Sequence, residues 1–362
     1  MVKLLISIYC FVVLIIMSII VTLCIIEKKK KLYNSHKIIN KEGIDEEVIL
    51  EIGGIKQYLY IRGENLNKPV ILFLHGGPGT SMIPELHTYQ YLWEKDYVFV
   101  NYDQRSANMS YYLNKKNWNE VSKTIECNIF IKDAKEIVDY LLKRFNKNKI
   151  IIMGHSWGSF VGIKFAQMYP EITYAYIGIG QVMNYKKSMI QLAHEVKSKI
   201  NSNDKNKSVI DSIIDELHAD KRLGLKLVSK LVTLSQKYLR QTKHNETLMM
   251  FCQSLISPHM PLKYIPYYAK SNKYNNVLYD TVFNWNIYEY KKSYKCPIIL
   301  VSGELDYACI FDTGNFIEYI NAPYKCNIVI KDSGHICMME NPGEFFNKIN
   351  TRLKEISVLK NS

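Results

Sequence analysis

Ser156 lies in the segment GHSWGS, residues 154–159, directly after the apolar run KIIIM. An apolar run that breaks into glycine and polar residues is typical of a strand that turns into a helix. A serine at the tip of such a turn has a strained backbone, which requires very small neighbours, here Gly154 and Gly158. The first N–H groups of the next helix favour negative charge there. The pattern predicts a nucleophilic serine, although a helix N-cap serine beside packing glycines would give the same short motif.

A serine nucleophile needs a base that takes its proton and an acid that orients the base. Asp306 follows the apolar run IILVSG, and His335 follows the next such run, NIVIKD. The chain order Ser, Asp, His, with each residue in a loop after a strand, is typical of one large class of serine hydrolases. We therefore predict a catalytic triad of Ser156, Asp306 and His335. Glu304 and Asp332 are the alternatives for the acid.

A third glycine-rich segment, HGGPG at residues 75–79, follows another apolar run. Two glycines and a proline make a tight turn that allows a backbone N–H to approach a substrate oxygen closely. The residue after the serine supplies the second N–H group in enzymes with this turn. We therefore assign the oxyanion hole to the backbone amides of Gly77 and Trp157.

These motifs require a scaffold of buried strands. Apolar runs of strand length alternate with segments of helical periodicity, which predicts a mostly parallel sheet with helices on both faces. The alternation stops at residues 184–292, which are largely amphipathic and helical. We interpret this stretch as a helical cap inserted between a first core segment, residues 46–183, and a second core segment, residues 293–362.

The N-terminal segment differs from the rest of the chain. The stretch from Leu4 to Ile26 carries no charge and exceeds the about 20 residues that span a bilayer. We predict a transmembrane anchor with a basic flank at residues 1–31, followed by a linker at residues 32–45. A cleaved signal peptide is the alternative, but its apolar region is usually shorter. Four lysines at residues 28–31 favour a cytoplasmic catalytic domain by the positive-inside rule, and this evidence leaves export open.

Composition narrows the choice of partners. The net charge is +13, but the lysines are scattered and show no arginine-rich stripe or basic-aromatic pattern typical of nucleic-acid binding. We predict membrane lipid as a partner through the N-terminal helix and no nucleic acid. The eight cysteines lie far apart, without a C-x-x-C pair or a Cys/His cluster at metal-ligand spacing, which argues against a disulfide framework and a zinc site.

Taken together, HGGPG, DQR at residues 103–105, GHSWGS, Asp306 and SGH at residues 333–335 resemble the proline iminopeptidase branch of the α/β-hydrolases. The similarity extends from about Glu46 to the end of the chain. It implies an eight-stranded sheet with a helical cap over the active site, hydrolysis through an acyl-enzyme, and no metal or cofactor. It also implies release of N-terminal residues, often proline, from peptides.

Two segments depart from the pattern of that branch. After DQR the branch usually has G-x-G-x-S, whereas this chain has Ser106 and Asn108 where glycines are expected. Before the serine the branch usually has a second glycine, whereas His155 is the form that is commoner in lipases and esterases. Both departures border the predicted site, so we expect them to bear on the choice of substrate.

A cap carboxylate that binds the free amine of the substrate is a further property of the branch, and no Trp-Glu pair in the cap matches it. Glu195, Asp215 and Glu216 are the candidates, although an exposed helix face would carry the same residues. The leading hypothesis is a membrane-anchored aminopeptidase acting on small peptides. A carboxylesterase or lysophospholipase acting on esters is the alternative, and a non-catalytic binding protein of the same fold is the second alternative. The sequence predicts no oligomeric state.

Overall fold

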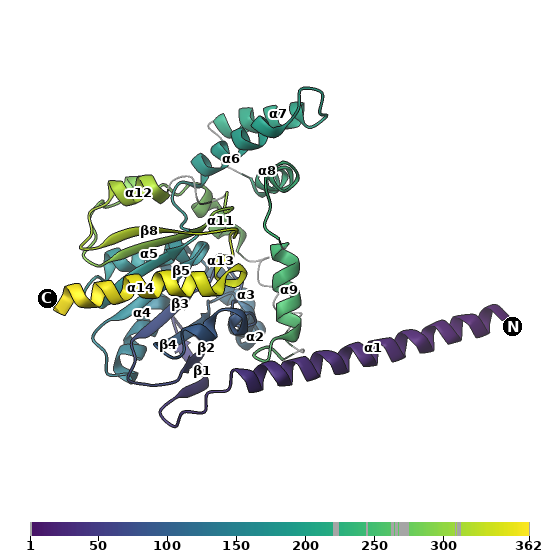
Figure 1. Ribbon diagram of the computed structural model, residues 1–362, viewed down its shortest axis with the longest axis horizontal. Helices are drawn as coiled ribbons and strands as arrows, with labels where there is room; N and C mark the ends of the chain where they lie inside the picture. The colour runs from purple at the N-terminus through teal and green to yellow at the C-terminus, as the bar shows by residue number, and fades with distance from the viewer. Residues whose placement is uncertain are drawn as a thin grey trace.

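An eight-stranded sheet in the order β1-β2-β4-β3-β5-β6-β7-β8 forms the centre of the protein (Figure 1). The computed structural model describes residues 2–361 except 220–223, 244, 262–263, 265–266, 268–274, 308 and 310–312. The strands are β1 (Ile44–Ile52), β2 (Ile55–Gly63), β3 (Val70–Leu74), β4 (Val98–Asp103), β5 (Ile150–His155), β6 (Thr173–Ile179), β7 (Ile298–Gly303) and β8 (Lys325–Ile330). β2 is antiparallel to both of its neighbours, and all other pairs are parallel. The predicted mostly parallel eight-stranded sheet is confirmed.

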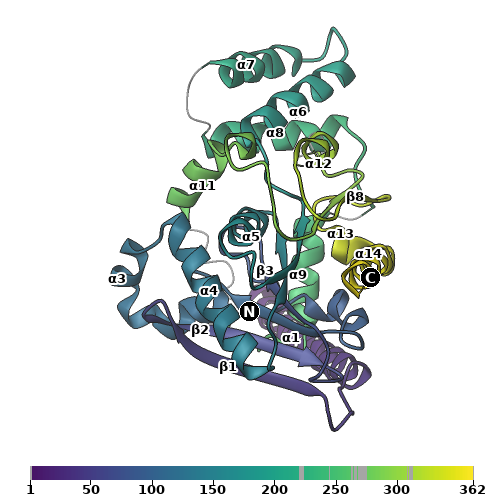
Figure 2. The same cartoon turned by 90° about the vertical axis from the view of Figure 1, so that its left-hand side faces the viewer.

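Helices cover both faces of this sheet (Figure 2). Along β3, Leu72 and Leu74 pack into one apolar core, while Ile71 and Phe73 pack into the core on the opposite face. The first core is closed by α4 (Cys127–Arg144), α5 (Trp157–Met168) and α12 (Thr313–Tyr319), and the second by α13 (Cys337–Glu340) and α14 (Pro342–Asn361). Short helices occupy the loops between β3 and β5: η1 (Leu86–Thr88), η2 (Gln90–Leu92), α2 (Asn108–Asn114), η3 (Lys115–Asn117) and α3 (Trp118–Lys123). Because both faces are buried, the central strands are continuously apolar.

A helical insertion separates β6 from β7. It comprises α6 (Tyr185–Lys199), α7 (Lys207–His218), α8 (Leu225–Tyr238), α9 (Glu246–Ile256), α11 (Asn276–Phe283) and η6 (Ile287–Glu289). Its two ends meet, because Asn184 and Asn286 form an antiparallel bridge and Ile287 N–H donates to Met183 O at 2.9 Å. The insertion therefore leaves and rejoins the core at one point, five residues after the end of β6.

The N-terminal helix α1 (Val2–Ser35) projects away from the rest of the protein (Figure 1). Its segment Tyr9–Ser35 is long and apolar enough to cross a membrane, with a mean hydropathy of 3.0 over an 18-residue window, although a signal sequence has the same properties. The helix continues beyond residue 31, so the expected linker, residues 32–45, is shortened to residues 36–43 between α1 and β1, which begins at Ile44. Glutamate, lysine and leucine favour helix, which explains why the basic flank extends the apolar helix.

Candidate active site

Ser156 occupies the turn between β5 and α5 with φ 51° and ψ −119°. A positive φ is rare for a residue with a side chain and marks a strained backbone. The turn is tightly packed: a Cβ on Gly158 would lie 1.9 Å from Leu74 O, and one on Gly154 would lie 2.3 Å from Gly158 O. Only glycine fits at these two positions. The backbone strain that the sequence motif implies is therefore present at Ser156.

The side chains of Asp306 and His335 are hydrogen-bonded, with 2.9 Å between Asp306 Oδ2 and His335 Nδ1. Asp306 lies three residues after β7, and His335 lies in the loop after β8. The Asp306 side chain is 2% exposed and that of His335 is 29% exposed. Burial opposes charge on the imidazole, but the charge of Asp306 and its hydrogen bond prevail and raise the pKa of His335 well above its ordinary value. The structure thus brings this pair together at the carboxyl ends of neighbouring strands.

The two alternative acids lie elsewhere. Glu304 and Asp332 have side chains that are 43% and 61% exposed, and both face Arg240. Asp332 N–H donates to Glu304 Oε2 at 3.0 Å. Their carboxylates therefore belong to an exposed ion-pair group, which leaves Asp306 as the carboxylate against His335.

His155 links the serine turn to the histidine loop. Its Nε2 lies 2.8 Å from His335 O, and the two rings lie 4.8 Å apart between centroids. Burial, reinforced by the charge of His335, lowers the pKa of His155 to about 3. A carbonyl can only accept a hydrogen bond, so neutral His155 carries its proton on Nε2 and holds the His335 loop beside Ser156.

Gln104 of the DQR segment ties together the two glycine-containing motifs HGGPG and GHSWGS. Gln104 N–H donates to His75 Nε2 at 3.0 Å, and its side-chain amide donates to His75 O at 2.7 Å. The indole N–H of Trp157 donates to Gln104 Oε1 at 2.8 Å. Burial lowers the pKa of His75 to about 4, so this imidazole remains a neutral acceptor. These bonds fix the HGGPG turn against the start of α5.

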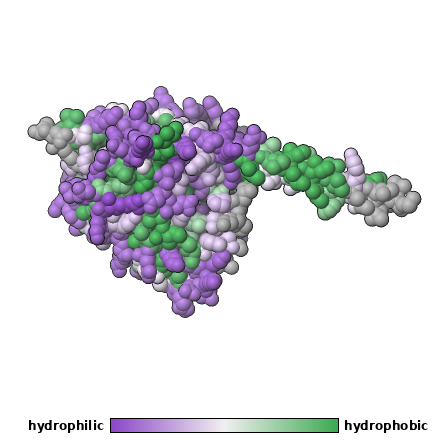
Figure 3. Space-filling view, turned by 90° about the horizontal axis from the view of Figure 1, so that it is seen from below, coloured by the Kyte–Doolittle hydropathy of each residue, from purple (hydrophilic) through white to green (hydrophobic). Residues whose placement is uncertain are grey.

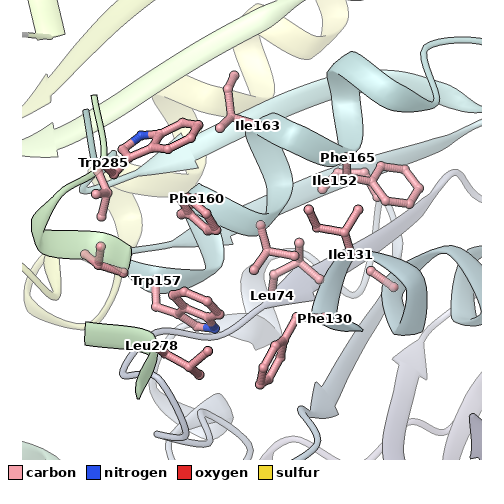
Figure 4. Close-up of a cluster of buried hydrophobic side chains, with 14 of the residues drawn as sticks. Leu74, Phe130, Ile131, Ile152, Trp157, Phe160, Ile163, Phe165, Leu278 and Trp285 are labelled. Carbon is pink, nitrogen blue, oxygen red and sulfur yellow. The ribbon is translucent and has the colours of Figure 1, made fainter. Parts of the chain in front are cut away.

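Both backbone amides assigned to the oxyanion hole occupy this junction. Trp157 is the first residue of α5, where a backbone N–H has no acceptor within the helix. Its ring is held edge-on by Phe130 and stacked by Phe160, both at 5.3 Å between centroids (Figure 4). Gly77 has φ 112°, which an L side chain rarely adopts. The rigid surroundings of Trp157 are suited to holding its N–H in one direction.

Ser106, one of the departures from the family pattern, connects the core to the cap. Its hydroxyl donates to Asn275 Oδ1 at 2.7 Å, and Asn275 Nδ2 donates to Pro78 O at 3.0 Å. Asn108, the second substituted residue of the same loop, has φ 25°, and asparagine tolerates positive φ better than most residues. The substituted loop thus keeps a glycine-like conformation at Asn108 and gains a polar link through Ser106.

Cys309 is a neighbour that the sequence analysis did not identify. Its Sγ atom, a carboxylate oxygen of Asp306 and a ring nitrogen of His335 all lie within 4.8 Å of one another. The spacing of these residues in the sequence did not predict this cluster. The thiol donates to Gly180 O at 3.3 Å. Burial, with the charge of Asp306, raises the pKa of Cys309 to about 11. The thiol is therefore protonated at neutral pH and acts as a packing and hydrogen-bonding group beside the pair.

A cavity of about 370 Å³ adjoins this pair and is lined in part by Leu192, Glu246, Tyr307 and His335. Glu246 is the first residue of α9, and its Oε1 accepts a hydrogen bond from His335 N–H at 2.8 Å. A cap carboxylate thus lies in the wall of the cavity beside the histidine. The sequence analysis missed Glu246 because the chain shows no motif around it.

The three cap carboxylates singled out from the sequence are exposed. Glu195 lies on α6, and its charge raises the pKa of Tyr307, after a larger effect of burial. Asp215 and Glu216 lie on the solvent-facing side of α7. Among the described residues, the cavity wall includes Glu246 and none of these three.

Comparison with known proteins identifies the family. The sequence pattern of the serine aminopeptidase S33 family matches residues 65–254. A probable aminopeptidase, YbaC, from Bacillus subtilis (strain 168) is 28% identical over 304 residues, covering 83% of this chain and 93% of the relative. The proline iminopeptidase of Mycobacterium smegmatis superposes with a TM-score of 0.62 at 15% identity, covering 87% of this chain and 100% of that chain. A proline iminopeptidase-related protein from Thermus thermophilus gives 0.59 at 17% identity, covering 86% and 98%. The chain has the α/β-hydrolase fold and belongs to the serine aminopeptidase S33 family of hydrolases.

Proposed function

We propose that the protein is a membrane-anchored serine aminopeptidase that releases N-terminal residues through an acyl-enzyme on Ser156. The hydrogen-bonded pair of His335 and Asp306 supports a triad, as does the strained turn at Ser156. The apolar segment of α1 supports the anchor, and the lysines that follow it favour a cytoplasmic catalytic domain.

In this mechanism the Nε2 atom of His335 takes the hydroxyl proton of Ser156 as the oxygen attacks the carbonyl carbon. Asp306 holds the proton on Nδ1 and stabilises the imidazolium that forms. The amides of Gly77 and Trp157 donate hydrogen bonds to the oxyanion. The imidazolium then protonates the leaving amine as the C–N bond breaks, and water, deprotonated by the same histidine, hydrolyses the acyl-enzyme. The products are a free amino acid and a shortened peptide.

The carboxylate of Glu246 carries the proposal of an amine-bearing substrate. A substrate ammonium enters a cavity only if a partner there offsets its desolvation, and Glu246 lies in the cavity wall beside His335. Glu195, whose charge acts on Tyr307 of the same wall, is the second candidate. The aminopeptidase name of the Bacillus subtilis relative agrees with this specificity.

The test replaces Glu246→Gln, which keeps an oxygen acceptor for His335 N–H but removes the charge. We expect KM for a free-amine arylamide to rise by about 10- to 100-fold, because a hydrogen bond to a charged group contributes about 1.5–3 kcal/mol. Turnover of a butyrate ester should not change. Asp215→Asn, an exposed cap carboxylate on α7, is the matched control. Equal loss on both substrates would assign Glu246 a structural role.

A carboxylesterase or lysophospholipase is the second candidate, favoured by His155 before the serine and by the apolar helix α1, which would bring the enzyme to lipid. A neutral ester needs no carboxylate partner. The wild-type enzyme separates the two functions: an aminopeptidase prefers the free-amine arylamide over its N-acetyl form and over the ester. Equal or better turnover of the acetylated or ester substrate would reject the aminopeptidase and support the esterase.

A further inference from the structure

Helix α9 of the cap has polar contacts on the side that faces the core. His87 Nε2 lies 3.2 Å from Gln253 Oε1, and the buried hydroxyl of Ser254 donates to Glu85. The inner side of an amphipathic helix in a globular protein is usually apolar. The neighbouring residues Met249 and Met250 pack against the core only in part. The core-facing side of α9 therefore combines these hydrogen bonds with two partly buried methionines.

The opposite side of α9 is apolar and exposed. Leu248 is 59% exposed and Phe251 is 53% exposed, and Cys252 is also exposed. With the half-buried Leu255 they recur at positions i, i+3, i+4 and i+7, which form one stripe along a helix. We call these four residues the outer α9 face. A contiguous exposed apolar stripe of this kind marks a site of contact with a protein or a membrane.

Helix α1 contacts α9 and is rigidly attached to the core. Lys29 Nζ donates to Met260 O at 2.7 Å, just beyond the end of α9. At the end of α1, His36 O accepts a hydrogen bond from the buried Arg62 at 2.5 Å, and the His36 ring stacks on Tyr91 at 4.8 Å. The two helices therefore have a fixed relation, so the position of one determines that of the other.

This relation places α9 near the end of the apolar part of α1. Lys29 follows Ile26, the last residue of the uncharged stretch, by three residues, which is about 5 Å along a helix. The headgroup layer on each side of a bilayer is about 5–8 Å thick. Figure 1 shows α9 running across the direction of α1, so a membrane crossed by α1 has its surface along α9. In Figure 3, seen from below, the apolar part of α1 extends from the more polar body of the protein.

We propose that the outer α9 face lies in the headgroup layer of the membrane that α1 spans, so that α9 is an interfacial helix. The proposal rests on the proposed anchor. The bilayer is preferred over a second copy of the chain because α1, which is long and apolar enough to cross a membrane, contacts α9. The lysines at residues 28–31 lie between the two apolar surfaces, where they can meet anionic lipid headgroups.

The placement brings the cavity close to the membrane. Glu246 and Thr247 of α9 line the cavity beside His335, and the next residue, Leu248, begins the outer α9 face. Less than one turn of helix thus separates the cavity wall from the proposed lipid contact. The substrates favoured by this arrangement are held at the membrane surface, with the scissile bond within reach of the headgroup layer.

The test uses the full-length protein in phosphatidylcholine–phosphatidylglycerol vesicles, with and without bromine on the acyl chains. Phe251→Trp adds an indole to the outer α9 face. Val358→Trp adds one to α14, at a residue that is 66% exposed and lies near the C-terminus, far from α1 in Figure 1. We expect brominated lipid to quench most of the emission added by Phe251→Trp and none of that added by Val358→Trp. Turnover and circular dichroism equal to wild type show that each variant is folded.

Three results would count against the proposal in distinct ways. If the protein does not float with the vesicles, the anchor itself fails. If it floats but the two variants are quenched equally, the anchor stands and the interfacial placement of α9 is overturned. If a short bismaleimide joins two chains through Cys252, in a product that Cys252→Ser abolishes, the outer α9 face meets a second copy and the proposal is also overturned.

Discussion

Asp306→Asn isolates the contribution of the buried carboxylate to catalysis. The substitution keeps the size of the side chain and leaves an atom close to His335 Nδ1, at the position of the 2.9 Å contact. It removes the negative charge that stabilises the imidazolium. It also allows the side-chain amide to donate to Nδ1, which places the imidazole proton on the nitrogen that should act as base.

The size of the effect follows from the geometry. Opposite charges about 4 Å apart at an effective dielectric constant of about 20 interact by about 4 kcal/mol, and Asp306 is buried enough for such weak screening. At about 1.4 kcal/mol per tenfold change in rate, this charge contributes about 10³-fold. Loss of the correct tautomer accounts for about 10⁴-fold in serine proteases. We therefore expect kcat to fall by about 10³- to 10⁴-fold.

The assay compares kcat of Asp306→Asn with those of Asp332→Asn and Glu304→Gln, which remove the two alternative acids. The variants Asp332→Asn and Glu304→Gln, which change exposed carboxylates, should have a kcat close to that of the wild type. The pH profile adds a second readout. His335 must be neutral to act as base and its pKa lies above 6.5, so wild-type kcat/KM should fall as pH decreases through a value above 6.5. The Asn variant should lose this fall or shift it to lower pH. Full activity in Asp306→Asn, or an equal loss in Asp332→Asn, would refute the assignment.

Two further predictions concern stability and the anchor. Burial raises the pKa of Asp103 to about 7 from 3.8, so the stability due to its bound proton is complete below about pH 4 and is lost as pH rises through 7. The free energy of unfolding of Asp103→Asn should therefore equal that of the wild type at pH 4 and exceed it by up to about 4 kcal/mol at pH 9. A difference that stays constant with pH would contradict the pKa shift. The full-length protein should resist extraction from membranes by high salt and by carbonate, because salt screens headgroup contacts and leaves the apolar stretch Leu4 to Ile26 unaffected. Recovery of a mature form that starts near Tyr33 would instead show that the segment is a cleaved signal.

The sheet and the serine turn could be predicted because their signals are local. The runs before Ser156 and Asp306 are apolar at every position, as strands buried on both faces require, and they became β5 and β7. The glycines at 154 and 158 are needed by contacts within a few residues and with β3. The helical insertion was predicted from the break in the alternation at residues 184–292, and the number of strands came from the resemblance to a family. The strand order was not predicted, since apolar runs alone do not specify which strands pair.

Cap residues were harder to predict because their positions depend on tertiary packing. Glu246 reaches His335 across a separation of 89 residues, and no spacing rule connects them. Cys309 follows Asp306 by three residues in the sequence, but its proximity to His335 arises only when β7 and β8 pair. For α9 the amphipathic pattern was visible, yet which side faces the core could not be read, because polar Gln253 and Ser254 are turned inward.

Labelling by a fluorophosphonate probe tests the central claim most directly, because the probe reacts with an activated serine. The purified full-length protein should be modified once, on the peptide that contains Ser156, as located by mass spectrometry. Ser156→Ala should abolish labelling, keep the melting temperature within the range expected for a surface substitution, and lower kcat by about 10⁶-fold, by analogy with subtilisin. Labelling that persists unchanged in Ser156→Ala would contradict the assignment of Ser156 as the nucleophile.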